Sequence, residues 1–349
     1  MYYYVNMKNY SIDEALGLFD DDLFKDIILS PELMRLRDIS FLGSVEKTEN
    51  AKRTSRFDHS IGVACLANKI SEKWNIDSEI RKYLIIACLL HDIGHGPLSH
   101  SLEPIIKKQL NIDHSTLTKR LIVGTYKINK KGKENNICRV LKIYNIHKTK
   151  ITSILSGKEN GLCSLLFRNP FNLDTLDGIN RVAFSLNIKY KDPEQIINLF
   201  HIKNGKVFIE VKDKAAFDEF WDLKNYIYKN YVYSTENLSY ELVLQKYYEY
   251  FLKKEKRDSD FILIDDTNLL KNFRNANYLD DMNKIILSHK ENDNIIKHNL
   301  KTFFRIDNYY FYHNSDEIDL NDIHLIYKRD SKQTGIEVAF EENKLIDIL

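Results

Sequence analysis

The stretch LLHDIGHGPLSH, residues 89–100, places a histidine–aspartate pair at the end of the apolar run YLIIACLL, residues 83–90. Two polar side chains buried there without partners would cost several kcal/mol. A divalent metal ion would satisfy both and would also supply chemistry. RFDHS (56–60) and NLDTLDGINR (172–181) offer further imidazole and carboxylate groups. The sequence therefore predicts that four side chains converge on one or two metal ions: His59, His91, Asp92 and Asp174.

Composition indicates a globular chain without a dominant electrostatic partner. Of its 349 residues, 43% are hydrophobic and 29% are charged, which is typical of folded domains and argues against disorder. The net charge of +1 creates no general attraction for nucleic acid or for a membrane surface. With only 12 Gly and 5 Pro, we expect long uninterrupted helices.

Three features predict a cytoplasmic protein with no membrane partner. The four cysteines form no CxxC pair, so we expect buried free thiols in a reducing compartment. The first eleven residues, MYYYVNMKNYS, lack the basic and apolar regions of a signal peptide. The longest apolar run, around residues 84–90, is too short to span a bilayer.

Apolar residues at helical spacing cover most of the first 190 residues. Ser30 and Pro31 suit the N-cap and the first position of a helix. The polar stretch YKINKKGKEN, residues 126–135, predicts an exposed loop. We expect helices from residue 31, over about 59–74 and 77–93, and over 102–110 and 114–123.

The pattern changes after residue 188. KVFIEVKD (206–213), FILIDD (261–266) and IEVAFEE (336–342) predict strands, and two tyrosine-rich helices are expected between them, over 221–234 and 236–254. We therefore predict a mainly α fold in two parts: a helical core over residues 1–190 and a mixed α+β C-terminal lobe over residues 191–349 that packs on it.

The donor set limits the choice of metal. Adjacent residues on a helix point about 100° apart, so His91 and Asp92 can approach one ion, or two neighbouring ions, from different directions. Two imidazoles and two carboxylates suit Mn²⁺, Fe²⁺, Zn²⁺ or Mg²⁺. A lone His-Asp dipeptide is more often a hydrogen-bonded surface pair. Five of the eleven histidines fall between residues 59 and 114, which favours the metal site.

Four motifs resemble those of the HD-domain phosphohydrolase superfamily, and within it the branch of deoxynucleoside-triphosphate triphosphohydrolases that includes bacterial dGTPases and the sterile-alpha-motif and HD-domain dNTPase. The motifs are RLRDISFLG (35–43), RFDHSIGVACLA (56–67), HDIGHGPLSHSLE (91–103) and NLDTLDGINR (172–181). The resemblance extends to about residue 290. It implies an HD-domain helical core over residues 1–190, and metal ligation by the four predicted ligands.

The resemblance also implies a set of catalytic side chains. His95, His100 and His114 would line the side that faces the phosphates, and the last two would activate the attacking water and protonate the leaving group. Glu103 would orient one of these histidines. Imidazole suits both roles because it titrates near neutral pH.

Three further side chains are expected to contact the substrate: Arg56, Arg181 and Tyr233. Arg56 would pair with phosphate oxygens, or alternatively form a salt bridge with Asp58 or another local carboxylate. Tyr233 would stack on the sugar, or alternatively be a core aromatic residue. Asp177 is expected to support the metal ligands.

Four positions depart from the pattern of the dNTPase branch: Phe41 replaces a glutamine, Thr175 a lysine, Gly178 a tyrosine and Val182 an aspartate. The family's residues at these positions contact the sugar or the phosphates. Polar groups that read a sugar hydroxyl are hard to replace without loss of selectivity. The departures therefore indicate a different substrate or a different pose.

Three functional hypotheses follow. The first is a metal-dependent phosphohydrolase acting on nucleotides, releasing triphosphate from a dNTP or NTP. The second is a phosphodiesterase or nuclease acting on single-stranded nucleic acid or on a cyclic or oligonucleotide messenger. The third is a non-catalytic nucleotide-sensing module. Relatives commonly assemble, so a homo-oligomer is also considered.

Overall fold

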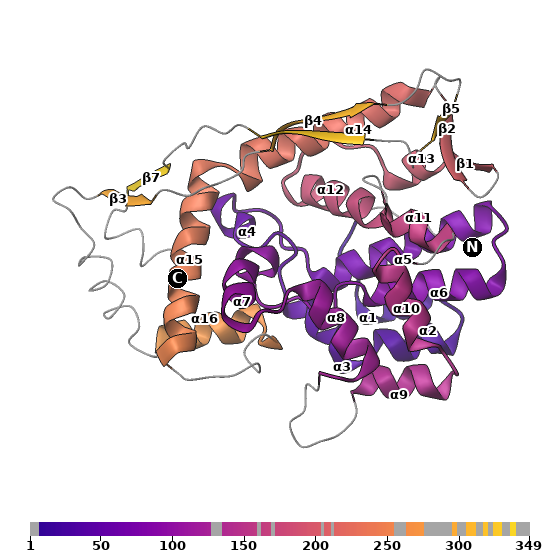
Figure 1. Cartoon of the computed structure of the whole chain (residues 1–349), viewed down its shortest axis with the longest axis horizontal. Helices are drawn as coiled ribbons and strands as arrows, with labels where there is room; N and C mark the ends of the chain where they lie inside the picture. Colours follow the sequence, from indigo (N-terminus) through magenta and orange to yellow (C-terminus); the bar gives the residue numbers. More distant parts are fainter. Residues whose placement is uncertain are drawn as a thin grey trace.

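Two long helices, α5 (Arg56–Lys73) and α6 (Ser78–Leu90), pack side by side in the helical region that holds the predicted metal ligands (Figure 1). The computed structural model describes residues 7–126, 135–158, 162–168, 172–203, 206–210, 213–254 and 263–275, together with strands between residues 295 and 339. Most of the predicted loop at 126–135 lies outside these residues.

Short helices surround this pair. Those before and after it in the first part of the chain are α1 (Ile12–Gly17), α2 (Asp22–Ile28), α3 (Pro31–Met34), the 3₁₀ turn η1 (Arg35–Asp38), α4 (Val45–Thr48), the 3₁₀ turn η2 (Ser99–Ser101), α7 (Glu103–Leu110) and α8 (His114–Val123). They are followed by α9 (Asn136–Ile143), α10 (Lys148–Leu155), α11 (Leu162–Arg168), α12 (Leu173–Ser185) and α13 (Pro193–Ile197).

Local capping sets where the central helices begin. The Ser55 side chain accepts from the Asp58 backbone N–H, and the Asp58 carboxylate accepts from the Ser55 backbone, so α5 begins at Arg56, three residues before the predicted start. Asp77 caps α6. The predicted cap at Ser30, with Pro31 as the first helical residue of α3, is confirmed. Helix α6 ends at Leu90, which leaves the histidine–aspartate pair just beyond its last turn.

Close packing of α12 on α5 brings a distant segment to the site. At Gly62 of α5, an added Cβ would lie 2.1 Å from Asp177 Oδ1 and 2.5 Å from the Arg181 guanidinium. Only glycine permits this approach, so the packing of the two helices depends on it. The core on both sides is apolar, and the four cysteines, Cys65, Cys88, Cys138 and Cys163, are buried free thiols as predicted.

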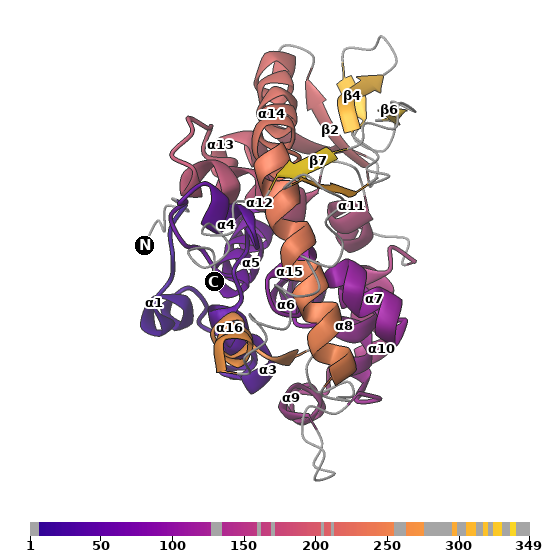
Figure 2. The same cartoon turned by 90° about the vertical axis from the view of Figure 1, so that its left-hand side faces the viewer.

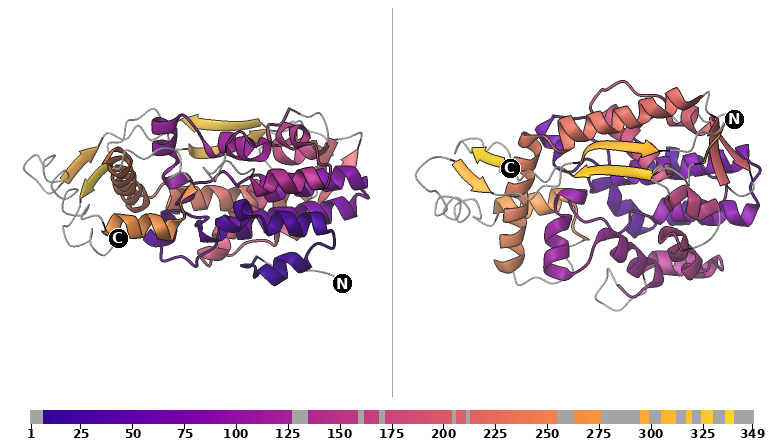
Figure 3. Two further views of the ribbon diagram at one scale, coloured as in Figure 1. Left: turned by 90° about the horizontal axis from the view of Figure 1, so that it is seen from below. Right: turned by 45° about the horizontal axis from the view of Figure 1, so that its top comes forward.

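The C-terminal region mixes helices with small antiparallel sheets, which confirms the predicted fold class. Its elements are β1 (Phe200–Lys203), β2 (Lys206–Glu210), α14 (Lys214–Ile227), the π-turn η4 (Tyr228–Val232), α15 (Thr235–Lys254), α16 (Asp266–Asn275), β3 (Ile295–His298), β4 (Arg305–Phe311), β5 (Glu317–Asp319), β6 (His324–Arg329) and β7 (Ile336–Ala339). The strand orders are β1-β2-β5, β3-β7 and β4-β6, and the β4-β6 ladder lies alongside α14 (Figure 3).

The sequence prediction is wrong at FILIDD. Ile264 and Asp265 belong to no strand, and Asp266 opens helix α16. The Asp266 carboxylate accepts from the backbone N–H groups of Ser40 and Leu98, both at 2.7 Å, so tertiary hydrogen bonds hold this segment. The boundary between two domains near residue 190 stays a prediction.

Helix α15 crosses α4, η2 and α7 on one side of the helical core (Figure 2). Its Glu241 carboxylate accepts from the hydroxyls of Ser44 and Ser101 at 2.9 and 2.8 Å. The C-terminal region thus supports the loop that carries His100. Among the described residues, every helix is too short or too polar to cross a membrane.

Candidate metal centre

Three helices deliver donor atoms to one point. His59 lies in α5, His91 directly follows α6, and Asp174 lies in the first turn of α12. His59 Nε2 lies 3.2 Å from His91 Nε2 and 3.0 Å from Asp174 Oδ1, and His91 Nε2 lies 3.8 Å from the same oxygen. Asp92 lies alongside, with its Oδ1 3.4 Å from His91 Nε2. The structure therefore brings all four predicted ligands together.

The hydrogen bond made by Nδ1 of each imidazole indicates which ring nitrogen carries the proton. His91 Nδ1 lies 2.7 Å from the Cys88 carbonyl oxygen, which can only accept, so Nδ1 carries the proton and Nε2 a lone pair. His59 Nδ1 likewise donates to Asp177 Oδ2 at 2.6 Å. When both imidazoles are neutral, two lone pairs and the Asp174 carboxylate oxygen face one another, an arrangement that repels unless a proton or a metal ion lies between them.

The spacing of these atoms fits a divalent ion. Metal–nitrogen and metal–oxygen bonds of about 2.0–2.2 Å place neighbouring ligands roughly 3.0–3.5 Å apart, close to the distances observed. Burial lowers the pKa of His59, but the hydrogen bonds to Asp174 and Asp177 outweigh burial and raise it to about 9. The site therefore favours a positive charge at this point, which a metal ion supplies.

Asp177 fixes the orientation of His59. Its carboxylate is fully buried and also accepts from Arg181 Nε at 2.8 Å and Arg181 Nη2 at 2.9 Å. Arg181 is 0% exposed, and its remaining nitrogen donates to the Lys8 carbonyl and to the Thr54 hydroxyl. The structure thus differs from the expectation that Arg181 contacts substrate: its donors are taken up inside the protein.

Asp92 joins the metal donors to Arg56. Arg56 Nη1 donates to Asp92 Oδ2 at 2.7 Å, and Arg56 Nε donates to the Ser99 hydroxyl at 2.8 Å. The salt bridge foreseen with Asp58 is therefore formed with Asp92 instead. Burial raises the pKa of Asp92, but His91, Arg56 and His95 together hold it well below its ordinary value. This carboxylate stays ionised.

A cluster of three histidines lies next to Asp92. The His95 and His114 rings stack with centroids 4.1 Å apart, and the His100 ring lies edge-on at 4.7 and 5.1 Å from them. Glu103 at the start of α7 serves both outer histidines: its Oε2 accepts from His100 Nδ1 at 2.8 Å and its Oε1 from His114 Nδ1 at 2.5 Å. His95 Nε2 lies 3.3 Å from Asp92 Oδ1.

The environments of His95 and His114 separate their protonation. Burial, reinforced by the charge of Arg56, lowers the pKa of His95 well below its ordinary value, so this imidazole is neutral. Burial also lowers the pKa of His114, but the hydrogen bond to Glu103 and the charge of Glu103 outweigh it and raise the pKa above its ordinary value. Glu103 remains ionised, because the two histidines lower its pKa despite burial. Paired groups with divergent pKa values are typical of acid–base sites.

The sequence analysis did not predict two features of the loop after α6: the side chain that holds it and its left-handed backbone. Arg35 of η1 donates to the carbonyls of Ile93 and His95 at 3.0 and 2.6 Å. Leu98 and Ser99 both adopt left-handed backbone conformations, with φ of 53° each, which is costly for residues other than glycine. No local pattern around Arg35 or Leu98 predicts these roles, because each depends on a partner from another part of the chain.

An aromatic wall covers one face of the centre. The Phe41 ring lies 4.5 Å from the His59 ring and 4.6 Å from the Arg56 guanidinium carbon. A Cβ at Gly178 would lie 3.3 Å from the tip of Phe41. Tyr233 ends η4, with its ring 5.6 Å from that of Tyr228, and its contact with a sugar stays a prediction.

Comparison with known proteins agrees with this geometry. Residues 56–167 match the HD domain family. The chain is 27% identical over 242 residues to the uncharacterized protein YwfO of Bacillus subtilis, covering 65% of this chain and 51% of that protein. It is 34% identical over 116 residues to the deoxynucleoside triphosphate triphosphohydrolase SAMHD1 homolog of Dictyostelium discoideum, covering 29% and 23% of the two chains. The chain thus spans about half the length of the Bacillus relative it matches.

A solved structure shares the fold. The phosphohydrolase from Bacteroides thetaiotaomicron superimposes with a TM-score of 0.60 at 21% identity, over 78% of this chain and 67% of that one. The helical core, the His/Asp donor set and the family match define an HD domain, whose members bind divalent metal ions. Residues 56–167 of the protein therefore form an HD domain, and part of the chain has distant sequence similarity to deoxynucleoside triphosphate triphosphohydrolases.

Proposed function

We propose that this protein hydrolyses nucleotides, and that it cleaves a dNTP or NTP to a nucleoside and inorganic triphosphate. The observation that carries the proposal is the position of Asp92, which contacts the donor set on one side and His95 of the histidine cluster on the other. Metal donors and acid–base groups are thereby held a few ångströms apart, as phosphoryl transfer requires. The distant dNTPase relative supports the choice of substrate class.

In the proposed mechanism a divalent ion would be held by four side chains: His59, His91, Asp92 and Asp174. A divalent ion bound there supplies Lewis-acid polarisation of a phosphoryl oxygen. Water attacks the α-phosphorus, the bond from that phosphorus to the 5′-oxygen breaks, and the leaving oxygen takes a proton.

The chain's own side chains would manage the protons and the charge. Glu103 raises the pKa of His114 above its ordinary value, which favours its protonated form, and we assign to His114 the protonation of the leaving oxygen. His100, which is 61% exposed and held by the other oxygen of Glu103, accepts a proton from the attacking water. Neutral His95 faces the phosphates. Arg56, held by Asp92, contributes positive charge beside the reacting group.

The aromatic wall favours one alternative. Phe41 and Gly178 replace side chains that read a sugar in the dNTPase branch, and they present an apolar ring where hydrogen-bonding groups would stand. A stacked base or a phosphodiester substrate would suit such a ring. The second candidate function is therefore a phosphodiesterase acting on an oligonucleotide or a cyclic nucleotide. The third candidate is a non-catalytic sensing role. The Glu103 carboxylate argues against it, because it holds His100 and His114 as an acid–base pair would require.

A panel resolved by product tests the proposal. Full-length protein loaded with Mn²⁺ or Mg²⁺ is incubated with dNTPs, NTPs, cyclic nucleotides and short oligonucleotides, and products are separated by anion-exchange chromatography. We expect inorganic triphosphate and nucleoside. His114→Gln should lower turnover by about 10²–10⁴-fold, whereas His147→Gln, at the N-cap of α10, should not.

The outcomes separate the candidates. Shortened oligonucleotides without triphosphate would favour the phosphodiesterase. If the metal-loaded protein turned over none of these compounds, both enzymatic hypotheses would be refuted and the non-catalytic sensing role would be favoured.

A further inference from the structure

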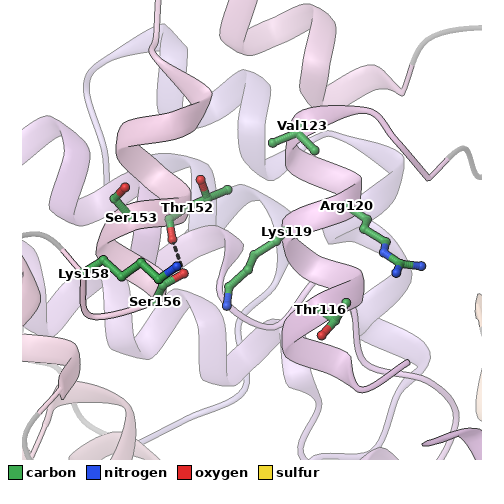
Figure 4. A pocket seen from close by; sticks show the side chains of 8 residues that line it. All are labelled: Thr116, Lys119, Arg120, Val123, Thr152, Ser153, Ser156 and Lys158. Carbon is green, nitrogen blue, oxygen red and sulfur yellow. Dashed lines mark hydrogen bonds between the residues drawn. The ribbon is translucent and has the colours of Figure 1, made fainter. Parts of the chain in front are cut away.

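A cavity separate from the metal centre lies on the outer side of α8. It is a cavity of about 320 Å³ between α8 and the end of α10 (Figure 4). Its walls come from two short stretches of chain: Thr116, Lys119, Arg120 and Val123 on α8, and Thr152, Ser153, Ser156 and Lys158 on and after α10. None of these residues belongs to the donor set or to the histidine cluster.

The lining has the chemistry of an anion site. Three of the eight side chains are cationic, four carry hydroxyl groups, one is apolar, and none is acidic. In Figure 4 the side chains of Lys119 and Lys158 extend from opposite walls into the space between the helices, while the Arg120 side chain extends away from that space. A cavity of this size is within the range of roughly 300–1,000 Å³ that small-molecule sites occupy.

Within the described residues, the two lysines have no carboxylate partner. Over the described ranges, neither Lys119 nor Lys158 forms an ion pair, whereas Lys150 on the neighbouring α10 lies 3.1 Å from Glu79. Over the same described residues the Ser153 hydroxyl has no hydrogen-bond partner, whereas the Thr116 side chain is hydrogen-bonded to the Asp113 carboxylate. Two ammonium groups directed into one hollow repel each other unless an anion binds between them. Phosphate oxygens would accept from both lysines and from the Ser153 hydroxyl.

Helix α8 connects this cavity to the metal centre. Residues 116, 119, 120 and 123 follow helical spacing and form one face of α8. On its other face, the Thr118 hydroxyl donates to the His91 carbonyl at 3.0 Å and accepts from the Gly94 backbone N–H at 2.9 Å. The helix begins with His114. A ligand in the cavity would therefore bind one helix away from the reaction centre.

From this arrangement we infer that the α8–α10 cavity binds a small phosphate-bearing molecule, at a site separate from the metal centre. The inference concerns a second ligand and does not depend on which phosphate bond the metal centre cleaves. Free polyphosphate and a nucleotide share the recognised chemistry, so both are included in the test.

Isothermal titration calorimetry on the full chain tests the inference. The background variant Asp174→Asn weakens the metal centre, and the probes are inorganic phosphate, inorganic triphosphate and ATP. Because a hydrogen bond to a charged group contributes about 1.5–3 kcal/mol, loss of either lysine should weaken binding about 10- to 100-fold. We therefore expect Lys119→Gln and Lys158→Gln each to raise Kd by that factor. The matched control Lys150→Gln removes the same charge outside the cavity and should leave Kd unchanged.

Each outcome bears on the inference. Saturable binding of triphosphate or ATP that both cavity variants weaken supports it, and the tighter of the two probes identifies the source of the phosphate. Equal weakening by Lys150→Gln would mean diffuse attraction and would overturn it. Binding that the wild type shows and the Asp174→Asn variant lacks would also overturn it, since the anion would then bind at the metal centre. Absence of saturable binding by every probe would also overturn it.

Discussion

Asp177→Asn should separate the structural and metal-orienting roles of one buried carboxylate. Asp177 and Arg181 are both buried, Arg181 Nε lies 2.8 Å from Asp177 Oδ2, and the same oxygen lies 2.6 Å from His59 Nδ1. Removing one partner of a buried ion pair leaves an uncompensated charge and costs about 3–5 kcal/mol. Loss of a carboxylate that orients a metal-binding histidine typically lowers metal affinity by about 10–100-fold. We expect both effects in the single variant.

The two effects are measured independently. Urea unfolding of the metal-free protein gives the change in the free energy of unfolding, and competition with a fluorescent chelator gives the affinity for Mn²⁺ or Zn²⁺. The paired variant Asp177→Asn/Arg181→Met removes the stranded charge while the amide keeps the shape that fits against Gly62. It should recover most of the lost stability but not the metal affinity, because an amide oxygen is a weaker acceptor for His59 than a carboxylate.

Two results would refute this reasoning. Wild-type metal affinity in the single variant would mean that Asp177 does not orient His59 as a ligand. Full recovery of metal affinity in the paired variant would mean that Asp177 acts only through the fold. In either case the contact between His59 and Asp177 would be structural.

Three other perturbations follow from the same geometry. Glu103→Gln removes a charged hydrogen bond worth about 1.5–3 kcal/mol, and at 1.36 kcal/mol per pKa unit the pKa of His114 should fall by about one to two units, as measured by NMR titration. In the wild type, protonated His114 stabilises the fold at pH values below its ordinary pKa, and this stabilisation is lost as pH rises through the raised pKa. The Glu103→Gln variant should lack this pH dependence of stability. An unchanged pKa of His114 in the variant would contradict the role assigned to Glu103. Gly94→Ala would place a Cβ 2.3 Å from the His114 carbonyl oxygen and 2.4 Å from the Thr118 nitrogen, so unfolding should become easier by about 1–3 kcal/mol; wild-type stability in urea would show that α8 can move freely. Saturation with metal at about 100 times Kd should stabilise the wild type by about 2.7 kcal/mol in thermal unfolding, and should not stabilise Asp174→Asn; equal stabilisation of both would place the ion elsewhere.

The parts of the site that the sequence predicts are those set by local pattern. The start of α3 follows from Ser30 and Pro31. The helix predicted over 77–93 is present as α6 but ends at Leu90, so the histidine–aspartate pair lies just beyond it. Donor types at fixed spacing are enough to propose a shared ion. The segment FILIDD has the composition of a strand, but Asp266 is held by backbone groups of Ser40 and Leu98, and tertiary contacts override the local preference there.

The partner of a charged side chain is the part that spacing does not predict. Asp58 lies two residues from Arg56 and is the obvious candidate, yet its carboxylate is used by Ser55 in the capping box. The arginine therefore pairs with Asp92, 36 residues away in sequence. Arg181 lies on the helix that carries Asp174 but is buried against Asp177. Pairing between distant elements requires the packing of α5, α6 and α12, which only the fold supplies.

The departures at Phe41 and Gly178 form a single structural change. A side chain at position 178 would meet the Phe41 ring at 3.3 Å, so the ring fills the space that the missing side chain leaves. The same ring covers His59 at 4.5 Å and lies against Arg56 at 4.6 Å, without touching the hydrogen bonds that orient either side chain. An aromatic face offers stacking in place of hydrogen bonds to a sugar. Substrate selection can therefore differ from that of the dNTPases while the donor set and the histidine cluster keep the same geometry, because the two depend on different contacts.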